Sequence, residues 1–315
     1  MNRRDFFALT AAASAIPAAR LQAEAALPSP APLLSFGLLT DVQYADAEPS
    51  GERHYRASIP KLKAAVATLA KENLPFTLHL GDMIDHDFSS YAAVLPLLEP
   101  LGQPVHHLLG NHDYSVTDAE KARVVSTLGM PHDYYMVRRS GVRLLLLDTT
   151  DLASYKHPAD SGQAQRATKM LSQLAATGAA NAQPWNGGVG ECQLAWLARE
   201  LTAADAAGEK VILCGHHPIL PADGHQIWTA AAVLGLIDQH PCVIAYFNGH
   251  NHAGSEMVRN GVPFITFKSI LHQPDTTAFA IIHLHADRLD ITGHGREKSR
   301  SFPLRGSSPD SLKAP

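Results

Sequence analysis

The chain alternates short apolar runs with longer segments of helical periodicity over most of its length. Apolar runs of about four to eight residues are typical of buried strands, whereas longer segments with one apolar face are typical of helices. The expected strands are Leu33–Thr40, Phe76–Leu80, Val105–Leu109, Val142–Leu147, Val211–Cys214 and Val243–Phe247. The expected helices are Ser58–Lys71, Cys192–Ala206 and Ile227–Gln239. This alternation predicts an α/β domain built around a sheet.

The last third of the chain has a different pattern, which favours hairpins. Met257–Ile265 contains an Asn-Gly turn signal, and Phe279–Ile291 alternates like a strand until an Ala-Asp pair interrupts it. Hairpins beside parallel strands predict a mixed sheet. The stretch 151–190 is rich in Ala, Gly, Gln and Ser and is expected to be a partly helical insertion over the site. We therefore predict one domain over residues 32–300 and a C-terminal tail over 301–315.

The first residues have the order of an export signal. Arg3 and Arg4 precede the apolar run Ala8–Ala19, which is too short to span a bilayer, and Ala23–Ala25 forms a small-x-small cleavage site. This order predicts a twin-arginine signal over residues 1–25, the twin-arginine export machinery as a partner, and a periplasmic or secreted protein. An amphipathic surface helix is the alternative. No later stretch is long enough to predict a membrane span.

The composition narrows the class of function. The 26 basic and 30 acidic residues give a formal charge of −4, which offers no basic footprint for nucleic acid. Three cysteines without CxxC spacing predict neither a disulfide framework nor a thiolate metal site, and Cys214 and Cys242 are expected to be buried free thiols. The 18 histidines are the unusual component, because histidine is the commonest metal ligand.

Polar groups follow five of the expected strands directly. The segments are Asp41-Val-Gln43, Gly81-Asp82-Met-Ile-Asp85, Gly110-Asn111-His112-Asp113, Gly215-His216-His217-Pro218 and Gly249-His250-Asn-His252. Each has an ordinary explanation as turn chemistry. Together they predict one site, because the carboxyl ends of strands in open α/β sheets border the ligand crevice. Oxygen and nitrogen donors without thiolate suit divalent manganese, iron or zinc.

The ordered set D-x-(H/Q), GD-x-x-D, GNHD, GHHP and GH-x-H resembles the calcineurin-like metallophosphoesterase superfamily. The resemblance extends from Asp41 to His252 and implies a four-layer α/β/β/α sandwich that holds two divalent metal ions. It also implies an enzyme, a phosphohydrolase that acts through metal-bound hydroxide.

The family pattern implies a role for each matching residue. Asp82 would bridge the two metals; Asp41, Gln43 and His252 would complete the first site, and Asn111, His216 and His250 the second. His112 resembles the histidine that stabilises the phosphoryl group or protonates the leaving oxygen, and Asp85 the carboxylate that orients it. His217 and Asp113 either tune the site or only brace its loops.

Gln43 departs from the pattern, because most members of the superfamily carry histidine at this position. An amide oxygen is a weaker and harder ligand than imidazole, which favours manganese or magnesium over zinc. A decayed site is the alternative, although every other ligand is present.

The departure narrows the resemblance to one subgroup. Asp41–Asp46 and Arg53–Ser58 resemble the D-x-Q-Y-A-D and R-x-Y-R-x-S segments of manganese-dependent ADP-ribose/CDP-alcohol diphosphatases. This implies hydrolysis of a pyrophosphate bond in a small phosphorylated substrate such as ADP-ribose, CDP-choline or CDP-glycerol. Arg53 and Arg56 are candidates to hold the distal phosphate, or else solvated charges at a helix start. Tyr44, Tyr55 and Trp228 are candidates to stack on a base, or else core aromatics.

The sequence leaves two other functions open. Export fits a periplasmic phosphodiesterase or phosphomonoesterase that scavenges phosphate with the same metals. A binding protein that holds the metals without turnover is the third possibility, but pure binding has little need for the oriented acid that His112 and Asp85 would form.

Overall fold

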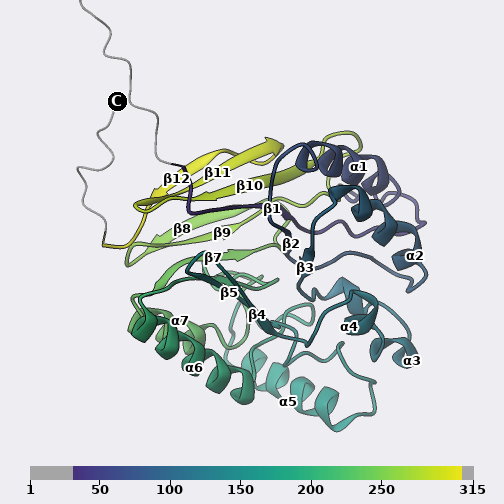
Figure 1. Cartoon of the computed structure of the whole chain (residues 1–315). Coiled ribbons are helices and arrows are strands. Elements are labelled where there is room, and N and C mark those ends of the chain that lie inside the picture. The colour runs from purple at the N-terminus through teal and green to yellow at the C-terminus, as the bar shows by residue number, and fades with distance from the viewer. Residues whose placement is uncertain (1–30, 307–315) are drawn as a thin grey trace, which may run out of the picture.

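The computed structural model describes residues 31–306. The predicted signal over 1–25 and residues 307–315 of the predicted tail lie outside the described residues. Two six-stranded sheets face each other, and helices cover the outer face of each sheet (Figure 1). This arrangement confirms the predicted α/β/β/α sandwich with mixed sheets.

The first sheet has the strand order β12-β11-β10-β1-β2-β3. Its strands are β1 Leu34–Leu39, β2 Thr77–His79, β3 Val105–His107, β10 Ala278–Leu284, β11 Arg288–Gly295 and β12 Arg300–Pro303. Strands β1, β2 and β3 run parallel, whereas β10, β11 and β12 add to β1 as an antiparallel meander.

The second sheet has the strand order β4-β5-β6-β7-β9-β8. Its strands are β4 Tyr135–Arg139, β5 Val142–Leu146, β6 Lys210–Cys214, β7 Val243–Asn248, β8 Ser255–Arg259 and β9 Val262–Thr266. The inner strands β5, β6, β7 and β9 are parallel, and antiparallel hairpins place β4 and β8 at the two edges. The β8–β9 hairpin turns at Asn260 and Gly261, both with positive φ, as the Asn-Gly signal predicts.

The helices lie between these strands in the chain. They are α1 Ser58–Leu69, α2 Ser90–Val94, α3 Asp118–Lys121, α4 Val124–Thr127, α5 Gly162–Ala176, α6 Glu191–Ala207 and α7 Ala230–Gln239, with 3₁₀ turns η1 Leu95–Leu101 and η2 His112–Tyr114. Helix α7 begins three residues after the predicted start at Ile227, because Ile227 and Trp228 donate backbone hydrogen bonds to Pro218 and Gly187 instead.

The core lies in three layers, which explains why most strands read as continuous apolar runs. Phe36 and Leu38 of β1 pack between the sheets against side chains such as Leu144 and Ile212. Leu39 belongs to the cluster under α1 and α2, and a third cluster lies under α6 and α7. Strands covered on both faces are apolar throughout, because burial of apolar area drives the packing on each side.

The predicted tail begins too early. Ser301, Phe302 and Pro303 belong to β12, which pairs with β11 as the edge of the first sheet. Phe302 also packs against the core between the sheets. The pairing satisfies backbone groups that β11 would otherwise leave open, and this long-range contact is the reason that the segment is ordered.

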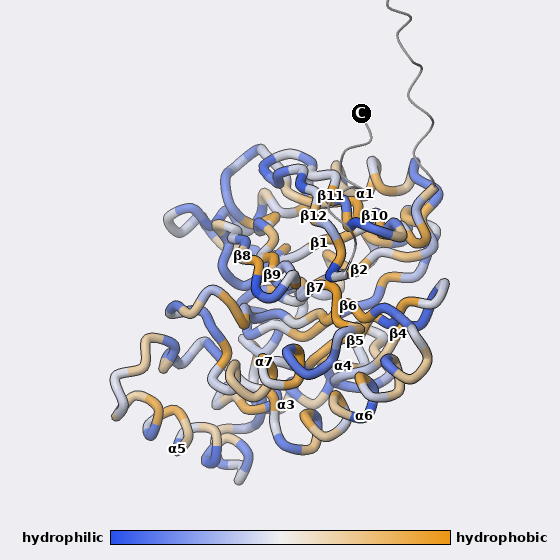
Figure 2. Tube along the Cα trace, turned by 90° about the vertical axis from the view of Figure 1, so that its left-hand side faces the viewer, coloured by the Kyte–Doolittle hydropathy of each residue, from blue (hydrophilic) through white to orange (hydrophobic). Residues whose placement is uncertain are grey.

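The insertion over 151–190 leaves the sandwich and returns to it. Figure 2 shows α5 projecting from the body of the protein, and only Ala164 and Ala167 of this helix are buried. At the return, the side-chain amide of Asn186 donates to the carbonyls of Asn181 and Gly224. The insertion is therefore partly helical, as predicted, and its end is fixed to the sandwich.

Among residues 31–306, none of the helices is both long and apolar enough to span a bilayer.

Candidate dinuclear metal centre

The residues predicted to bind metal lie on five loops, each directly after a strand. Asp41 and Gln43 follow β1, Asp82 follows β2, and Asn111 follows β3; His216 follows β6, and His250 with His252 follows β7. These strands are parallel within each sheet, so their carboxyl ends meet at one edge of the sandwich. The topology thus brings residues up to 209 positions apart in the chain into hydrogen-bonding contact.

The backbone of these loops is left-handed at four of the predicted metal-ligand positions. Asp41, Gln43, Asp82 and His250 have φ values of 49°, 41°, 60° and 66°. This conformation is uncommon for residues with a side chain and costs of order 1–3 kcal/mol each, so surrounding contacts must impose it. Such strain typically gathers where a protein holds side chains for chemistry, and here it turns four of them to one point.

Two glycines of the motifs allow a close approach of the loops. A Cβ atom on Gly110 would lie 2.1 Å from Oδ1 of Asp82, and one on Gly249 would lie 2.1 Å from Oγ1 of Thr40 and 2.3 Å from Oδ2 of Asp41. Neither position can hold a side chain without displacing an aspartate of the site. The glycines therefore serve the packing of the ligands more than the turns themselves.

The ligand atoms of the first predicted site converge. Nε2 of His252 lies 3.3 Å from Oδ1 of Asp41 and 3.0 Å from Nε2 of Gln43, which donates to Oδ2 of Asp82 at 2.8 Å. In this structure the Gln43 oxygen accepts from NH1 of Arg53 at 3.4 Å; as a metal ligand, Gln43 would present this oxygen to the site in place of its nitrogen. Two carboxylates, an amide oxygen and an imidazole fit a manganese site.

The second predicted site is equally compact. Nε2 of His216 lies 3.2 Å from Oδ2 of Asp82 and 3.2 Å from Oδ1 of Asn111, and Nδ1 of His250 lies 3.0 Å from the same Asn111 oxygen. Nδ1 of His216 donates to the Leu80 carbonyl at 2.8 Å, so in the neutral ring Nε2 is the nitrogen that offers a lone pair to the site. The four groups have the donors and the tautomer that a divalent metal requires.

Asp82 is the residue that the two sites share. Its Oδ2 contacts both Gln43 and His216, while its Oδ1 accepts a hydrogen bond from the backbone N–H of His112 at 2.8 Å. Burial raises the pKa of Asp82, but His216 and His112 together lower it well below its usual range. A fully buried carboxylate that stays ionised at this junction fits the predicted bridging role.

His112 and Asp85 form the predicted pair beside the metal sites. Nδ1 of His112 lies 2.9 Å from Oδ1 of Asp85, so Nε2 is the nitrogen that faces the pocket. Burial lowers the pKa of His112, but the charges of Asp82 and Asp85 raise it by more, and the net shift is upward. NH1 of Arg53 lies 3.3 Å from that Nε2, which places a fixed positive charge next to the imidazole.

Asp113 and His217 brace the loops. The Asp113 carboxylate accepts hydrogen bonds from the backbone N–H groups of Asp82, Met83 and Gly110 and from the hydroxyl of Tyr91. Both ring nitrogens of His217 have partners, since Nδ1 contacts Thr149 Oγ1 at 2.8 Å and Nε2 donates to the Trp185 carbonyl at 3.1 Å. His217 lies near His216 and His250, but it has no free lone pair for a metal.

Two residues that the sequence did not indicate contact the histidines of the predicted metal sites. Asn186 accepts at Oδ1 from Nε2 of His250 at 3.1 Å, and Nε2 of His272 lies 2.9 Å from Nδ1 of His252. Burial, with the His252 charge, lowers the pKa of His272 to about 4, so this ring is a neutral acceptor. Partners of this kind fix the tautomer of a ligand and raise its basicity. Neither Asn186 nor His272 lies in a polar segment directly after a strand, which is the pattern that predicts the other site residues.

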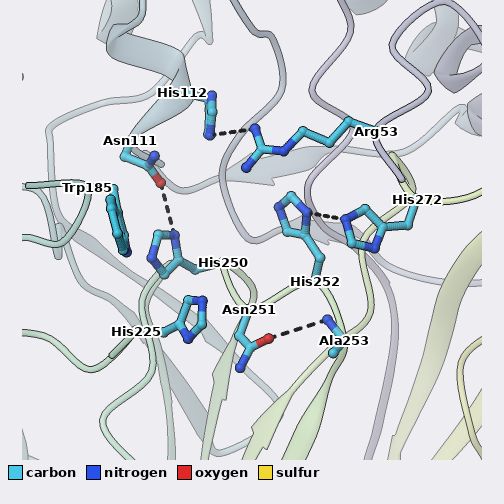
Figure 3. Close-up of a pocket in the computed structure, with 10 residues that line it drawn as sticks. All are labelled: Arg53, Asn111, His112, Trp185, His225, His250, Asn251, His252, Ala253 and His272. Carbon is cyan, nitrogen blue, oxygen red and sulfur yellow. Dashed lines mark hydrogen bonds between the residues drawn. The ribbon is translucent and has the colours of Figure 1, made fainter. Parts of the chain in front are cut away.

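A pocket of about 420 Å³ opens over these residues. Figure 3 shows Asn111, His112, His250 and His252 together with Arg53, Trp185, His225 and His272 around it. The structure brings Arg53 into the pocket but places Arg56 on the surface, paired with Asp46 and Glu48. Of the predicted stacking aromatics, Tyr55 and Trp228 are buried and Tyr44 packs against the core. Trp185 lines the pocket instead.

The three cysteines are free, and Cys214 is buried as expected, while Cys242 is half-buried and Cys192 exposed.

Several known proteins are similar to this chain in sequence and architecture. A family model described as calcineurin-like phosphoesterase matches residues 34–254. A manganese-dependent ADP-ribose/CDP-alcohol diphosphatase of Oryza sativa subsp. japonica is 34% identical over 296 residues, which cover 83% of this chain and 91% of the relative. The Mus musculus diphosphatase of the same name is 30% identical, covering 85% and 93%. The crystal structure of a dimetal phosphatase from Danio rerio superposes with a TM-score of 0.76 at 27% identity, covering 86% of this chain and 99% of the other.

Proposed function

We propose that this chain, which belongs to the calcineurin-like phosphoesterase family and is a metal-dependent phosphoesterase, cleaves the pyrophosphate bond of ADP-ribose and CDP-alcohol type nucleotides. The observation that carries the proposal is the convergence of the seven predicted ligand residues at one place, with Asp82 between Gln43 and His216 and with Arg53 beside Gln43. The diphosphatase name of the relatives in rice and mouse supports the substrate class.

Different residues of the chain have different roles toward such a substrate. Arg53 offers its guanidinium to a phosphate next to His112, and a pyrophosphate substrate provides a second phosphate for it. Asp85 fixes the His112 ring at Nδ1, and Nε2, which contacts NH1 of Arg53 at 3.3 Å, would supply a proton to the leaving oxygen once a phosphate takes up Arg53. The chemistry that two bound divalent ions supply at such a site is polarisation of the phosphoryl group and activation of water.

Manganese is the metal that the donor set favours. The first site combines two carboxylates, one amide and one imidazole, and the second combines the shared carboxylate, an amide and two imidazoles. Hard oxygen donors in this proportion suit manganese and magnesium better than zinc, which prefers nitrogen and sulfur.

Product analysis on the metal-stripped protein tests the proposal. ADP-ribose, CDP-choline, AMP and an aryl phosphodiester are each supplied with manganese, magnesium or zinc. We expect manganese-dependent release of AMP and CMP well above the other activities. Preference for the aryl diester or for AMP would make the enzyme a phosphate scavenger, and absence of turnover with every metal would make it a binding protein.

Export through the twin-arginine route is a separate part of the proposal, and it rests on Arg3, Arg4 and the apolar run that follows them. Replacing both arginines by lysine should retain the protein in the cytoplasm without changing its activity there. Fractionation of cells that carry each form measures this, and equal export of the two would remove the twin-arginine assignment.

A further inference from the structure

Trp185 is unusual among the exposed apolar side chains of residues 31–306. The large exposed ones are Leu33, Met136, Trp185, Met257 and Val258. Of these, only Trp185 lines the pocket over the metal-site residues, where 46% of its surface is open. Scattered exposed apolar residues need no explanation, but an indole held open in a polar pocket points to a ligand that covers it.

The backbone that carries Trp185 is fixed from the carbonyl of this residue onward. Its carbonyl accepts from Nε2 of the buried His217 at 3.1 Å. The next residue, Asn186, is bonded through its side chain to three groups, including His250. One residue later, the Gly187 carbonyl accepts from the N–H of Trp228 at 2.8 Å. An aromatic ring on such a rigid stem loses little conformational freedom when a ligand stacks on it.

Trp185 and Arg53 line opposite sides of the pocket. Figure 3 shows Trp185 beside Asn111 and His250 on one side, while Arg53 lies with His112 on the other. The metal-site histidines His250 and His252 lie between them. A substrate whose central phosphate lies over these histidines therefore presents one end to a cation and the other end to a planar aromatic surface.

We propose that Trp185 is the stacking platform of a nucleobase subsite in this pocket. The proposal rests on the proposed function for the class of substrate and adds the half of the pocket in which the nucleoside lies. A purine or pyrimidine stacks on the indole, and the distal phosphate extends toward Arg53. His225 lies on the same side of the pocket, next to His250, and offers a ring nitrogen to the edge of the base.

Binding of two product-like probes tests this subsite without requiring the diphosphatase reaction. AMP and ribose 5-phosphate both present a phosphate monoester and a ribose, and only AMP has a base. Their dissociation constants are measured by calorimetry on the manganese-loaded protein and on Trp185→Ala and Trp185→Phe. The matched control is Trp196→Ala, because Trp196 packs against Tyr134 away from the pocket. Thermal melting confirms that each variant is folded.

We expect Trp185→Ala to weaken AMP binding by about tenfold, which is the size of one base–aromatic stack, and to leave ribose 5-phosphate binding unchanged. Trp185→Phe should keep most of the affinity, since it keeps a ring, and Trp196→Ala should keep all of it. Equal affinity of the wild type for the two probes, or an equal loss of both in Trp185→Ala, would overturn the subsite. A subsite confirmed in a protein that does not hydrolyse ADP-ribose would leave this inference standing and refute the proposed function.

Discussion

Nε2 of His250 donates a hydrogen bond to Oδ1 of Asn186 at 3.1 Å. The direction follows from the amide, because Nδ2 of Asn186 already donates to the carbonyls of Asn181 and Gly224 and only Oδ1 is left to accept. His250 therefore carries its proton on Nε2 and has its Nδ1 lone pair free toward Asn111 and a metal. Through this bond, the end of the insertion sets the tautomer of a residue in the metal centre.

Asn186→Ala should weaken the second metal site by about 10- to 100-fold, since outer partners of ligating histidines have effects of this size. The first site should change much less. Titration of the metal-stripped protein with manganese measures both affinities. Asn181→Ala is the matched control, because its side chain bonds the same loop at the Ile227 carbonyl without contacting His250. Equal affinities in the two variants would show that Asn186 only supports the loop.

Gln43→His should shift the metal preference of the first site from manganese toward zinc by about tenfold, because imidazole replaces the harder amide oxygen. Competition between the two ions, followed by metal analysis of the protein, measures the shift. Gln43→Ala provides the reference for simple loss of the ligand, with weaker binding of both ions. Manganese dependence that does not change in Gln43→His would contradict this account of the first site.

His112→Ala should lower the turnover number by about 10²- to 10⁴-fold, the usual contribution of a positioned acid, while two metal ions per chain remain bound. Asp85→Asn should have a smaller effect in the same direction, since the imidazole stays in place but loses its carboxylate partner. Steady-state kinetics with metal analysis measures both quantities. His132→Ala, at an exposed histidine, is the control. Full activity of His112→Ala would refute its role.

Metal affinity should fall as the pH falls from about 8 to 6. Burial lowers the pKa of His216, but Asp82, Asp41 and the Leu80 carbonyl together raise it to about 9, so in the absence of metal the ring keeps its proton above the usual pKa of about 6.5. A metal binds only the neutral ring, and protons therefore compete with it as the pH falls, by up to tenfold per pH unit for each proton displaced.

Calorimetry in buffers of different ionisation enthalpy measures the protons released when manganese binds. Release of at least part of one proton per chain at pH 7 is expected. A manganese affinity that is constant over this pH range, with no proton release, would show that His216 is already neutral.

The sequence by itself indicated most of the strands, their mixed arrangement and the candidate ligand set. The reason is local: each strand is a continuous apolar run that ends at a polar segment, so both the element and its functional residue can be read from one short stretch. The order of these segments was also specific enough to indicate the family. The sequence did not show that the first sheet extends to Pro303 or that α7 begins at Ala230, because sheet pairing decides the first boundary and a loop contact the second.

Only the tertiary structure decided which side chains surround the predicted metal ligands. Asn186 contacts a histidine 64 positions away, and His272 contacts one 20 positions away, so no local pattern marks either residue. Arg53 and Arg56 look alike in the sequence, but an isolated β-bridge between Arg53 and His272 fixes the first beside the pocket, while Asp46 and Glu48 hold the second at the surface. Trp185 lies in the pocket and Trp228 in the core for the same physical reason: packing between distant segments, not residue type, selects the side chains that stay exposed at the site.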